Sequence, residues 1–350
     1  MATKKIPERV GFLSEGVRCA GWLYRPDAAG RMSPLVILGH GLGGTRPMRL
    51  DAFAERFVAE GWMVLIFDYR YLGASEGEPR QLLDIRKQLQ DWHAALAYAR
   101  SLPGVDLERV ALWGSSFGGG HVMQVAAEDP RLAAVIAQCP FTDGYASLKA
   151  RLQTGFLSAL TLTAAGVVDK IGSWLGAPPL LLPMVGPAWL PAFLTAPDAI
   201  SGMARLAPPG SQVARRTSRL LRRMPALERK LLPAMTLSER EVAPDQDSIW
   251  GAVLIPAGGR PFLNALAARL ALEIGFYRPG QRLRQLNMPV LVCVCDHDSV
   301  APAAATLGAA EKAPQAQVKR YPYGHFDIYV GAAFESVVAD QIKFLQNCLS

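Results

Sequence analysis

The sequence has few cysteines, few charged residues and no apolar run at its N-terminus. Its five cysteines are odd in number and scattered, so a framework of structural disulfides is not expected. The opening residues, MATKKIPERVGF, lack the apolar stretch of a secretory signal peptide. Together these absences predict a protein of the reducing cytoplasm.

Charge is scarce and is concentrated in one place. Only 19% of the 350 residues are charged and 50% are hydrophobic, which suits a large buried core and excludes wholesale disorder. The formal net charge is +7, and +6 of it lies in residues 215–230. The rest of the chain is nearly neutral, so no nucleic-acid partner is expected.

Two stretches without charge raise the question of a membrane span. Residues 152–168 are at the short limit for a spanning helix. Residues 171–197 contain six prolines, which would break such a helix. We therefore expect both stretches to belong to a buried or substrate-facing cap.

Short apolar runs alternate with helical patterns at both ends of the chain. A hairpin or meander is expected near the start, and strands and helices then alternate up to Asp143. The predicted strands cover residues 34–40, 62–70, 109–114, 132–140, 288–296 and 317–323, and the predicted helices cover 48–60, 82–101, 117–128, 302–313 and 333–348. This alternation predicts an α/β fold with a mostly parallel sheet and helices on both faces.

The alternation is interrupted over residues 144–288. This segment has a helix-like apolar pattern broken by prolines, without convincing strand alternation. It predicts a helical cap inserted into a core made of residues 1–143 and 289–350.

A nucleophile motif stands between a predicted strand and a predicted helix. Residues 114–118 read GSSFG, in which glycines flank a sharp turn that lifts Ser116 above the sheet. Residues 73–77, GASEG, match the same pattern, but Glu78 and Pro79 follow where a helix would be needed. We therefore predict that Ser116 is the nucleophile and that Ser75 is a structural turn residue.

A serine hydroxyl needs a base, and the base needs an acid that fixes its tautomer. Of the five histidines, His325 is the one in a loop just beyond the last predicted strand. His93 and His121 fall inside predicted helices, and His40 belongs to the glycine-rich motif described below. His325 is therefore the predicted base.

The acid should follow a strand between Ser116 and His325 in the chain. Asp298 meets this condition, because it follows the predicted strand at residues 288–296 and precedes a predicted helix. Asp296 and Asp143 also follow strands and remain as alternatives.

A glycine-rich segment, HGLGG at residues 40–44, follows another predicted strand. It offers a backbone N–H for a tetrahedral oxyanion, and the expected donors are the amides of Leu42 and Phe117. No GxxxxGK phosphate loop occurs in the sequence, and no nucleotide and no other cofactor is expected.

These motifs together resemble the α/β-hydrolase superfamily: HGLGG, DYRYLGASEG, GSSFG, an Asp-x-x-x-Pro segment and a final Gly-His. The opening residues and the position of the cap resemble the branch that contains dienelactone-hydrolase-like and X-prolyl-dipeptidyl-peptidase-like domains. The resemblance implies the α/β-hydrolase fold and a triad of Ser116, Asp298 and His325. Cys295 departs from the glycine that many relatives have in the acid loop.

The resulting hypothesis is a serine hydrolase that cleaves an ester, thioester or lactone with an apolar acyl group. A carbon–carbon bond hydrolase, an acyltransferase and a prolyl-type peptidase use the same triad and remain alternatives. The peptidase would need a carboxylate in the cap, and Glu239, Glu241 and Asp245 lie in too polar a stretch to be assigned. A non-enzymatic binder of apolar ligands should have lost a triad member, and none is missing.

Two weaker signals concern metals and anionic partners. Cys293, Cys295 and His297 alternate along a predicted strand, but no second pair of ligands accompanies them, so no metal is expected. The basic segment 215–230 is interpreted as the solvated face of a cap helix, with Arg215, Arg219, Arg222 and Arg223 near one side. A weak contact with an anionic lipid surface or an acidic acyl-carrier protein is the alternative. The oligomeric state is left open.

Overall fold

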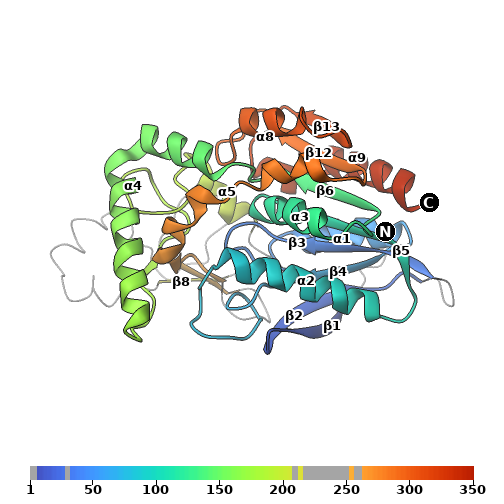
Figure 1. The fold of residues 1–350 in the computed structure, drawn as a ribbon, viewed down its shortest axis with the longest axis horizontal. Coiled ribbons are helices and arrows are strands. Elements are labelled where there is room, and N and C mark those ends of the chain that lie inside the picture. The colour runs from blue at the N-terminus through green and yellow to red at the C-terminus, as the bar shows by residue number, and fades with distance from the viewer. Residues whose placement is uncertain (1–5, 28–31, 207–211, 216–251, 256–261) are drawn as a thin grey trace.

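The computed structural model describes residues 6–27, 32–206, 212–215, 252–255 and 262–350. Within them an eight-stranded sheet has the order β1-β2-β4-β3-β5-β6-β12-β13 (Figure 1). The strands are β1 (Glu8–Ser14), β2 (Val17–Tyr24), β3 (Ser33–Gly39), β4 (Met63–Phe67), β5 (Val105–Ser115), β6 (Ala134–Gln138), β12 (Val290–Cys295) and β13 (Ala316–Tyr321). Strand β2 is antiparallel to β1 and β4, and the other neighbours are parallel.

Helices cover both faces of this sheet. They are α1 (Leu50–Ala59), α2 (Ile85–Ser101), α3 (Phe117–Glu128), α8 (Ala303–Ala310) and α9 (Gly331–Leu349). The chain moves from β3 to β4 in one direction along the sheet and from β4 to β5 in the other. Because parallel crossovers are right-handed, α1 and α2 lie on opposite faces. Helix α3 packs against α2 and α9 packs against α1, which confirms the predicted layers.

Burial follows from this layering. Strands β3, β4, β6 and β12 are buried along their whole lengths. A parallel sheet with helices on both faces needs apolar side chains on both sides of each strand, which is why these segments are continuous apolar runs in the sequence.

The segment between β6 and β12 differs in part from the helical cap that was predicted. It contains the helices α4 (Gly144–Trp174) and α5 (Ala199–Leu206), and Figure 1 shows α4 standing at one end of the molecule, away from the C-terminus. It also contains short strands and 3-10 turns: β7 (Leu181–Leu182), β8 (Gln212–Arg215), β9 (Ala252–Ile255), β10 (Phe262–Leu263), β11 (Leu266–Ala267), η1 (Ala268–Leu272), η2 (Ile274–Phe276) and η3 (Pro279–Gln285). Strands of two to four residues are too short to produce a recognisable alternation in the sequence.

Part of the basic segment falls on one of these strands. Arg215 ends β8 and is therefore not on a helix, which corrects the helical placement predicted for it. The rest of the segment, residues 216–230, lies outside the described residues, as do Glu239, Glu241 and Asp245.

Helix α4 is tied to the returning part of the insertion. The Asp169 carboxylate, which is 1% exposed, pairs with the Arg269 guanidinium of η1 at 2.7 Å and accepts the amide of Leu180 at 2.7 Å. The stretch Gly155–Trp174 of this helix is long and apolar enough to cross a membrane. Of its 18 most apolar consecutive residues, 28% are buried. Length and composition alone are weak evidence for a span, since core helices meet the same test.

Candidate active site

The turn that carries Ser116 joins β5 directly to α3. Ser116 has φ 55° and ψ −118°, a backbone conformation that residues other than glycine rarely adopt. A Cβ on Gly114 would lie 2.1 Å from the carbonyl oxygen of Gly118, and one on Gly118 would lie 2.5 Å from that of His40. Glycine is thus required on both sides, as the motif predicted.

Three side chains from separate loops meet at this turn. His325 Nε2 lies 3.0 Å from Ser116 Oγ, and His325 Nδ1 lies 2.7 Å from Asp298 Oδ2. Asp298 follows β12 and His325 follows β13. The carboxyl ends of parallel strands meet at one edge of the sheet, which is why residues so distant in sequence lie together. The arrangement suits transfer of the hydroxyl proton to an imidazole that a carboxylate orients.

Asp298 is held so that it fixes the imidazole. Its Oδ1 accepts the amides of Val300 at 2.8 Å and Ala301 at 2.6 Å, which leaves Oδ2 for His325. Burial lowers the pKa of His325, but the negative charge of Asp298 more than offsets this, and the pKa is raised well above 6.5. In the neutral ring, Nδ1 therefore donates to Asp298 and Nε2 is free to accept from Ser116.

The other two candidate acids are engaged elsewhere. Asp296 pairs with Arg320 at 2.8 Å on an exposed surface. Asp143 caps the start of α4 and pairs with Arg278 at 2.8 Å. Of the three carboxylates that follow strands, Asp298 is the one bonded to His325.

Ser75, in the second GxSxG match, has its hydroxyl bonded to the backbone. Ser75 is fully buried, and its hydroxyl donates to the carbonyl of Asp68 at 2.5 Å and accepts the amide of Ala20 at 2.8 Å. These bonds tie the turn after β4 to β2, so the hydroxyl is occupied by the backbone. The interpretation of Ser75 as a turn residue agrees with this geometry.

Two histidines outside the site are also accounted for. His93 bonds to Glu128 at 2.8 Å on the surface. His121 is buried in α3 between the Tyr277 hydroxyl at 2.8 Å and the Gln88 amide oxygen at 2.9 Å, and burial lowers its pKa to about 3. His121 is therefore neutral and supports the packing of the elbow helix.

The glycine-rich segment passes directly beside the nucleophile. A Cβ on Gly41 would lie 2.8 Å from the Cβ of Ser116, and Leu42 lines the same cavity as Ser116. Phe117 opens α3, so its amide has no acceptor within the helix. The segment that carries Leu42 and the first residue of α3 thus both lie beside Ser116, and their amides stay the predicted oxyanion donors.

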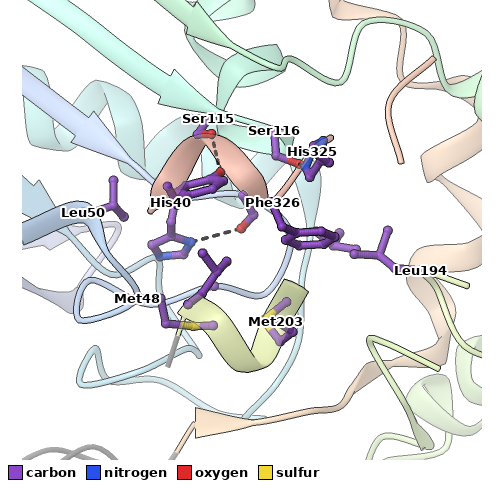
Figure 2. Close-up of a pocket in the computed structure, with 14 residues that line it drawn as sticks. His40, Met48, Leu50, Ser115, Ser116, Leu194, Met203, His325 and Phe326 are labelled. Atoms are coloured by element: carbon purple, nitrogen blue, oxygen red, sulfur yellow. Dashed lines mark hydrogen bonds between the residues drawn. The ribbon is translucent and has the colours of Figure 1, made fainter. Parts of the chain in front are cut away.

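The cavity in front of Ser116 is small and mostly apolar. Its volume is about 40 Å³, and Figure 2 shows Leu194 and Met203 beside the ring of Phe326. Its apolar lining consists of Leu42, Met48, Leu50, Leu194, Met203, Leu206, Phe326 and Tyr329. Nothing in the sequence indicated which residues of the insertion would face the cavity, whereas Phe326 and Tyr329 could have been suspected from their closeness to His325.

Helix α5 of the insertion is linked to both loops of the site. Arg205 pairs with Asp327 at 2.9 Å, two residues after His325. Ser299, next to Asp298, donates its hydroxyl to Asp198, which precedes α5. Two polar links therefore hold the wall of the cavity to the loops that carry the acid and the base.

A buried polar network supports the nucleophile turn from behind. The Ser116 amide donates to the Gln138 carbonyl at 2.9 Å, and the Gln138 side chain donates to Ser115 Oγ at 3.2 Å. Ser115 also bonds to the Tyr329 hydroxyl, and Gln341 of α9 donates to the Gln138 side chain at 2.7 Å. Sequence analysis missed this network, because its members are dispersed over more than 200 residues of chain.

The pattern of Cys293, Cys295 and His297 on β12 and just beyond it does not form a common site. Cys293 and Cys295 are buried within β12, whereas His297 is exposed beyond the end of the strand. The strand ends at Cys295, so the alternation that would have placed the three residues on one side does not reach His297.

The chain is similar in sequence to a known family and to several known proteins. The family model described as serine aminopeptidase, S33, matches residues 30–179. The quorum-quenching protein AidA of Acinetobacter baumannii is 46% identical over 343 residues, which cover 98% of this chain and 95% of that protein. The thiohydrolase aneE of Aspergillus aculeatus is 26% identical over 99% of this chain and 95% of its own length.

A solved structure is similar over the whole fold. The α/β hydrolase GrgF from Penicillium sp. sh18 superposes with a TM-score of 0.68 and 22% sequence identity, covering 99% of each chain. This likeness concerns the fold, and it includes the sheet whose carboxyl edge carries Ser116.

Proposed function

Because this chain belongs to the α/β-hydrolase superfamily, we propose that it cleaves an ester, thioester or lactone with an apolar acyl group through an acyl-enzyme on Ser116. It is an enzyme of the serine-hydrolase class that acts on a small molecule. The finer similarity to dienelactone-hydrolase-like and X-prolyl-dipeptidyl-peptidase-like domains stays a prediction.

The observation that carries the proposal is the continuous chain of hydrogen bonds from Ser116 through His325 to Asp298. His325 Nε2 takes the hydroxyl proton while Ser116 Oγ attacks the acyl carbon. The oxyanion that forms accepts hydrogen bonds from the amides of Leu42 and Phe117. The leaving alcohol or thiol takes the proton from His325, and water then releases the acid by the same steps.

The lining of the cavity supports an apolar acyl group. Eight apolar side chains surround the space in front of Ser116, so burial of methylene groups there is favourable. The name of the relative aneE, a thiohydrolase, supports thioesters as one substrate class. The carbon–carbon hydrolase and prolyl-type peptidase alternatives differ in the bond that is cleaved. The acyltransferase alternative differs in the acceptor, which takes the acyl group in place of water.

A substrate panel tests the proposal. Purified protein should hydrolyse p-nitrophenyl esters, acyl thioesters or lactones faster than dipeptide amides, and Ser116→Ala should lower that turnover by roughly 10³-fold or more. Equal turnover by the wild type and Ser116→Ala would overturn the acyl-enzyme. A preference for dipeptide amides would favour the peptidase.

We also propose that the enzyme works in the cytoplasm. All five cysteines are free, and Cys19, Cys139, Cys293 and Cys295 are buried, which supports a reducing compartment.

A further inference from the structure

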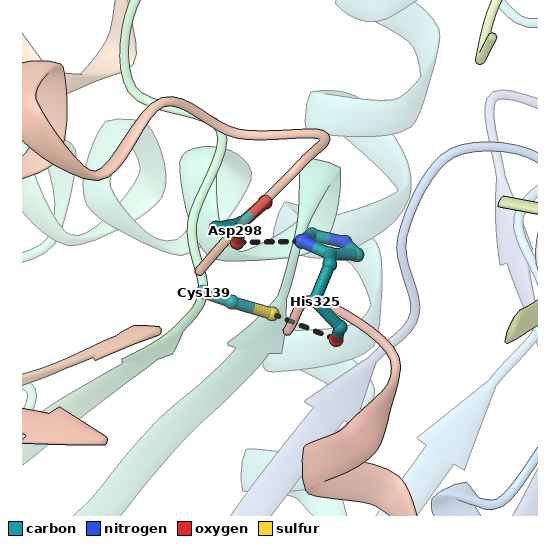
Figure 3. A group of neighbouring side chains, drawn as sticks. All are labelled: Cys139, Asp298 and His325. Atoms are coloured by element: carbon teal, nitrogen blue, oxygen red, sulfur yellow. Dashed lines mark hydrogen bonds and ion pairs between the residues drawn. The ribbon is translucent and has the colours of Figure 1, made fainter. Parts of the chain in front are cut away.

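A buried cysteine thiol lies against the acid and the base of the site. Cys139 directly follows β6, and its amide donates to the carbonyl of Cys293 at 2.8 Å, which ties it to the neighbouring strand β12. Figure 3 shows its side chain beside Asp298 and His325, with the sulfur directed toward the carbonyl oxygen of His325, 4.0 Å away. One ligand atom from each of the three residues lies within 4.8 Å of the other two. The proposed reaction has no use for this thiol.

These three groups match the ligands of one class of metal ion. Thiolate, imidazole and carboxylate are the protein ligands of Zn²⁺, and the thiolate disfavours Mg²⁺ and Ca²⁺. With metal–ligand distances of about 2.0–2.3 Å, ligands of a single ion lie roughly 3–4 Å apart. The present spacing is therefore within reach of small side-chain movements. His325 also lines the acyl cavity.

We propose that Cys139, Asp298 and His325 bind Zn²⁺ and that the bound ion switches the enzyme off. The inhibition rests on the proposed function, because it requires His325 to be the base. An ion at Nδ1 takes the position of the proton that Asp298 now accepts, and that proton moves to Nε2. A protonated Nε2 no longer accepts the hydroxyl proton of Ser116.

The proton balance gives this inhibition a signature. The ring keeps one proton, which changes nitrogen, and the Cys139 thiol loses its proton to solvent when it binds the ion. One proton is thus released for each ion that binds to enzyme whose His325 is neutral. The ion does not fill the acyl cavity, so kcat should fall while KM changes little.

Kinetic titration with matched variants tests the site. Zn²⁺ added to the wild type in a non-chelating buffer should remove at least nine-tenths of ester hydrolysis, and EDTA should restore it. Cys139→Ser should raise the inhibitory concentration at least tenfold, each variant being compared with its own rate in EDTA. Cys293→Ser changes another buried thiol, on β12, and should keep wild-type sensitivity. Equal sensitivity of Cys139→Ser and the wild type would overturn the site.

A binding measurement separates this inference from the proposed function. Co²⁺ should give a thiolate-to-metal absorption band at one ion per chain in both the wild type and Ser116→Ala, and no band in Cys139→Ser. A band in a protein that hydrolyses no acyl substrate would uphold the metal site and sink the proposed function. Hydrolysis by a wild type that shows neither band nor Zn²⁺ inhibition would overturn the metal site alone.

Discussion

Gly202 of helix α5 lies against the ring of Phe326 so closely that a Cβ at this position would be 2.2 Å from the ring's Cγ. Phe326 directly follows His325, and α5 carries Met203 and Leu206, which line the acyl cavity. This contact between the insertion and the core therefore joins the wall of the cavity to the residue that follows the predicted base.

Substitution of this glycine should disturb the base. In Gly202→Ala the new methyl group has to displace α5 or the Phe326 ring, and a misplacement of about 1 Å at a reacting group costs up to roughly 100-fold in rate. We expect kcat/KM for an ester substrate to fall roughly 10- to 100-fold. Gly308→Ala in α8 is the matched control, because nothing lies within 4 Å of its Cβ position. Thermal unfolding should show that both variants are folded. Equal activities of the two folded variants would contradict the effect of the Gly202–Phe326 contact on the base.

A covalent probe should identify the nucleophile. A fluorophosphonate reacts quickly only with an activated serine hydroxyl, so we expect Ser116 to be the labelled serine. Peptide mass spectrometry locates the adduct, and labelling of Ser75 or Ser115 instead would refute the assignment. Ser116→Ala should lower kcat by roughly 10³-fold or more, and the residual rate should come from the oxyanion donors and substrate binding. The protein should stay folded, because the change in the side chain is small.

The pH dependence of kcat/KM should report the base. His325 must be neutral to accept a proton, and its pKa is raised above 6.5 by Asp298. Activity should therefore rise with pH through a single ionisation above 6.5 and be lost as the pH falls through that value. A rate that is constant from about pH 5 to 9, with chemistry limiting, would exclude a histidine base.

Removal of the acid should change both the rate and the position of this ionisation. In Asp298→Asn the charge that raises the pKa of His325 is gone and burial continues to lower it. The rising limb should move to lower pH, and kcat should fall by about 10⁴-fold, because the imidazole loses its orienting partner. Asp296→Asn is the control and should keep the wild-type profile, since Asp296 pairs with Arg320.

Longer acyl chains should raise kcat/KM only until the cavity is full. Burial of one methylene contributes about 0.8 kcal/mol, which corresponds to threefold to fourfold in rate until the cavity is full. A cavity of about 40 Å³ should be filled early in the series from acetate to octanoate p-nitrophenyl esters. Met203→Ala should move the optimum to longer chains. Absence of any chain-length preference in the wild type would mean that this space is not an acyl pocket.

The order of the core elements and the positions of Ser116 and His325 followed from local signals in the sequence, which left Asp298 as the first of three candidate acids. Two glycines around Ser116 mark a turn that no other residue fits, because added Cβ atoms would meet backbone oxygens. Apolar runs buried on both sides mark the parallel strands. In a parallel sheet the residues after the carboxyl ends of the strands share one edge. Ser116, Asp298 and His325 could therefore be expected to lie together before any interatomic distance was known.

The tertiary structure alone decided which carboxylate binds His325, which residues wall the cavity, and that Cys139 lies beside the acid and the base. Asp296 and Asp298 are two residues apart and look alike in the sequence, and they differ because one faces Arg320 and the other faces His325. The cavity wall depends on how the insertion packs on Phe326, and its short strands leave no periodic pattern. Sequence patterns report the local backbone and the side that is buried, whereas these contacts join residues far apart in the chain and exist only after the sheet and the insertion have packed together.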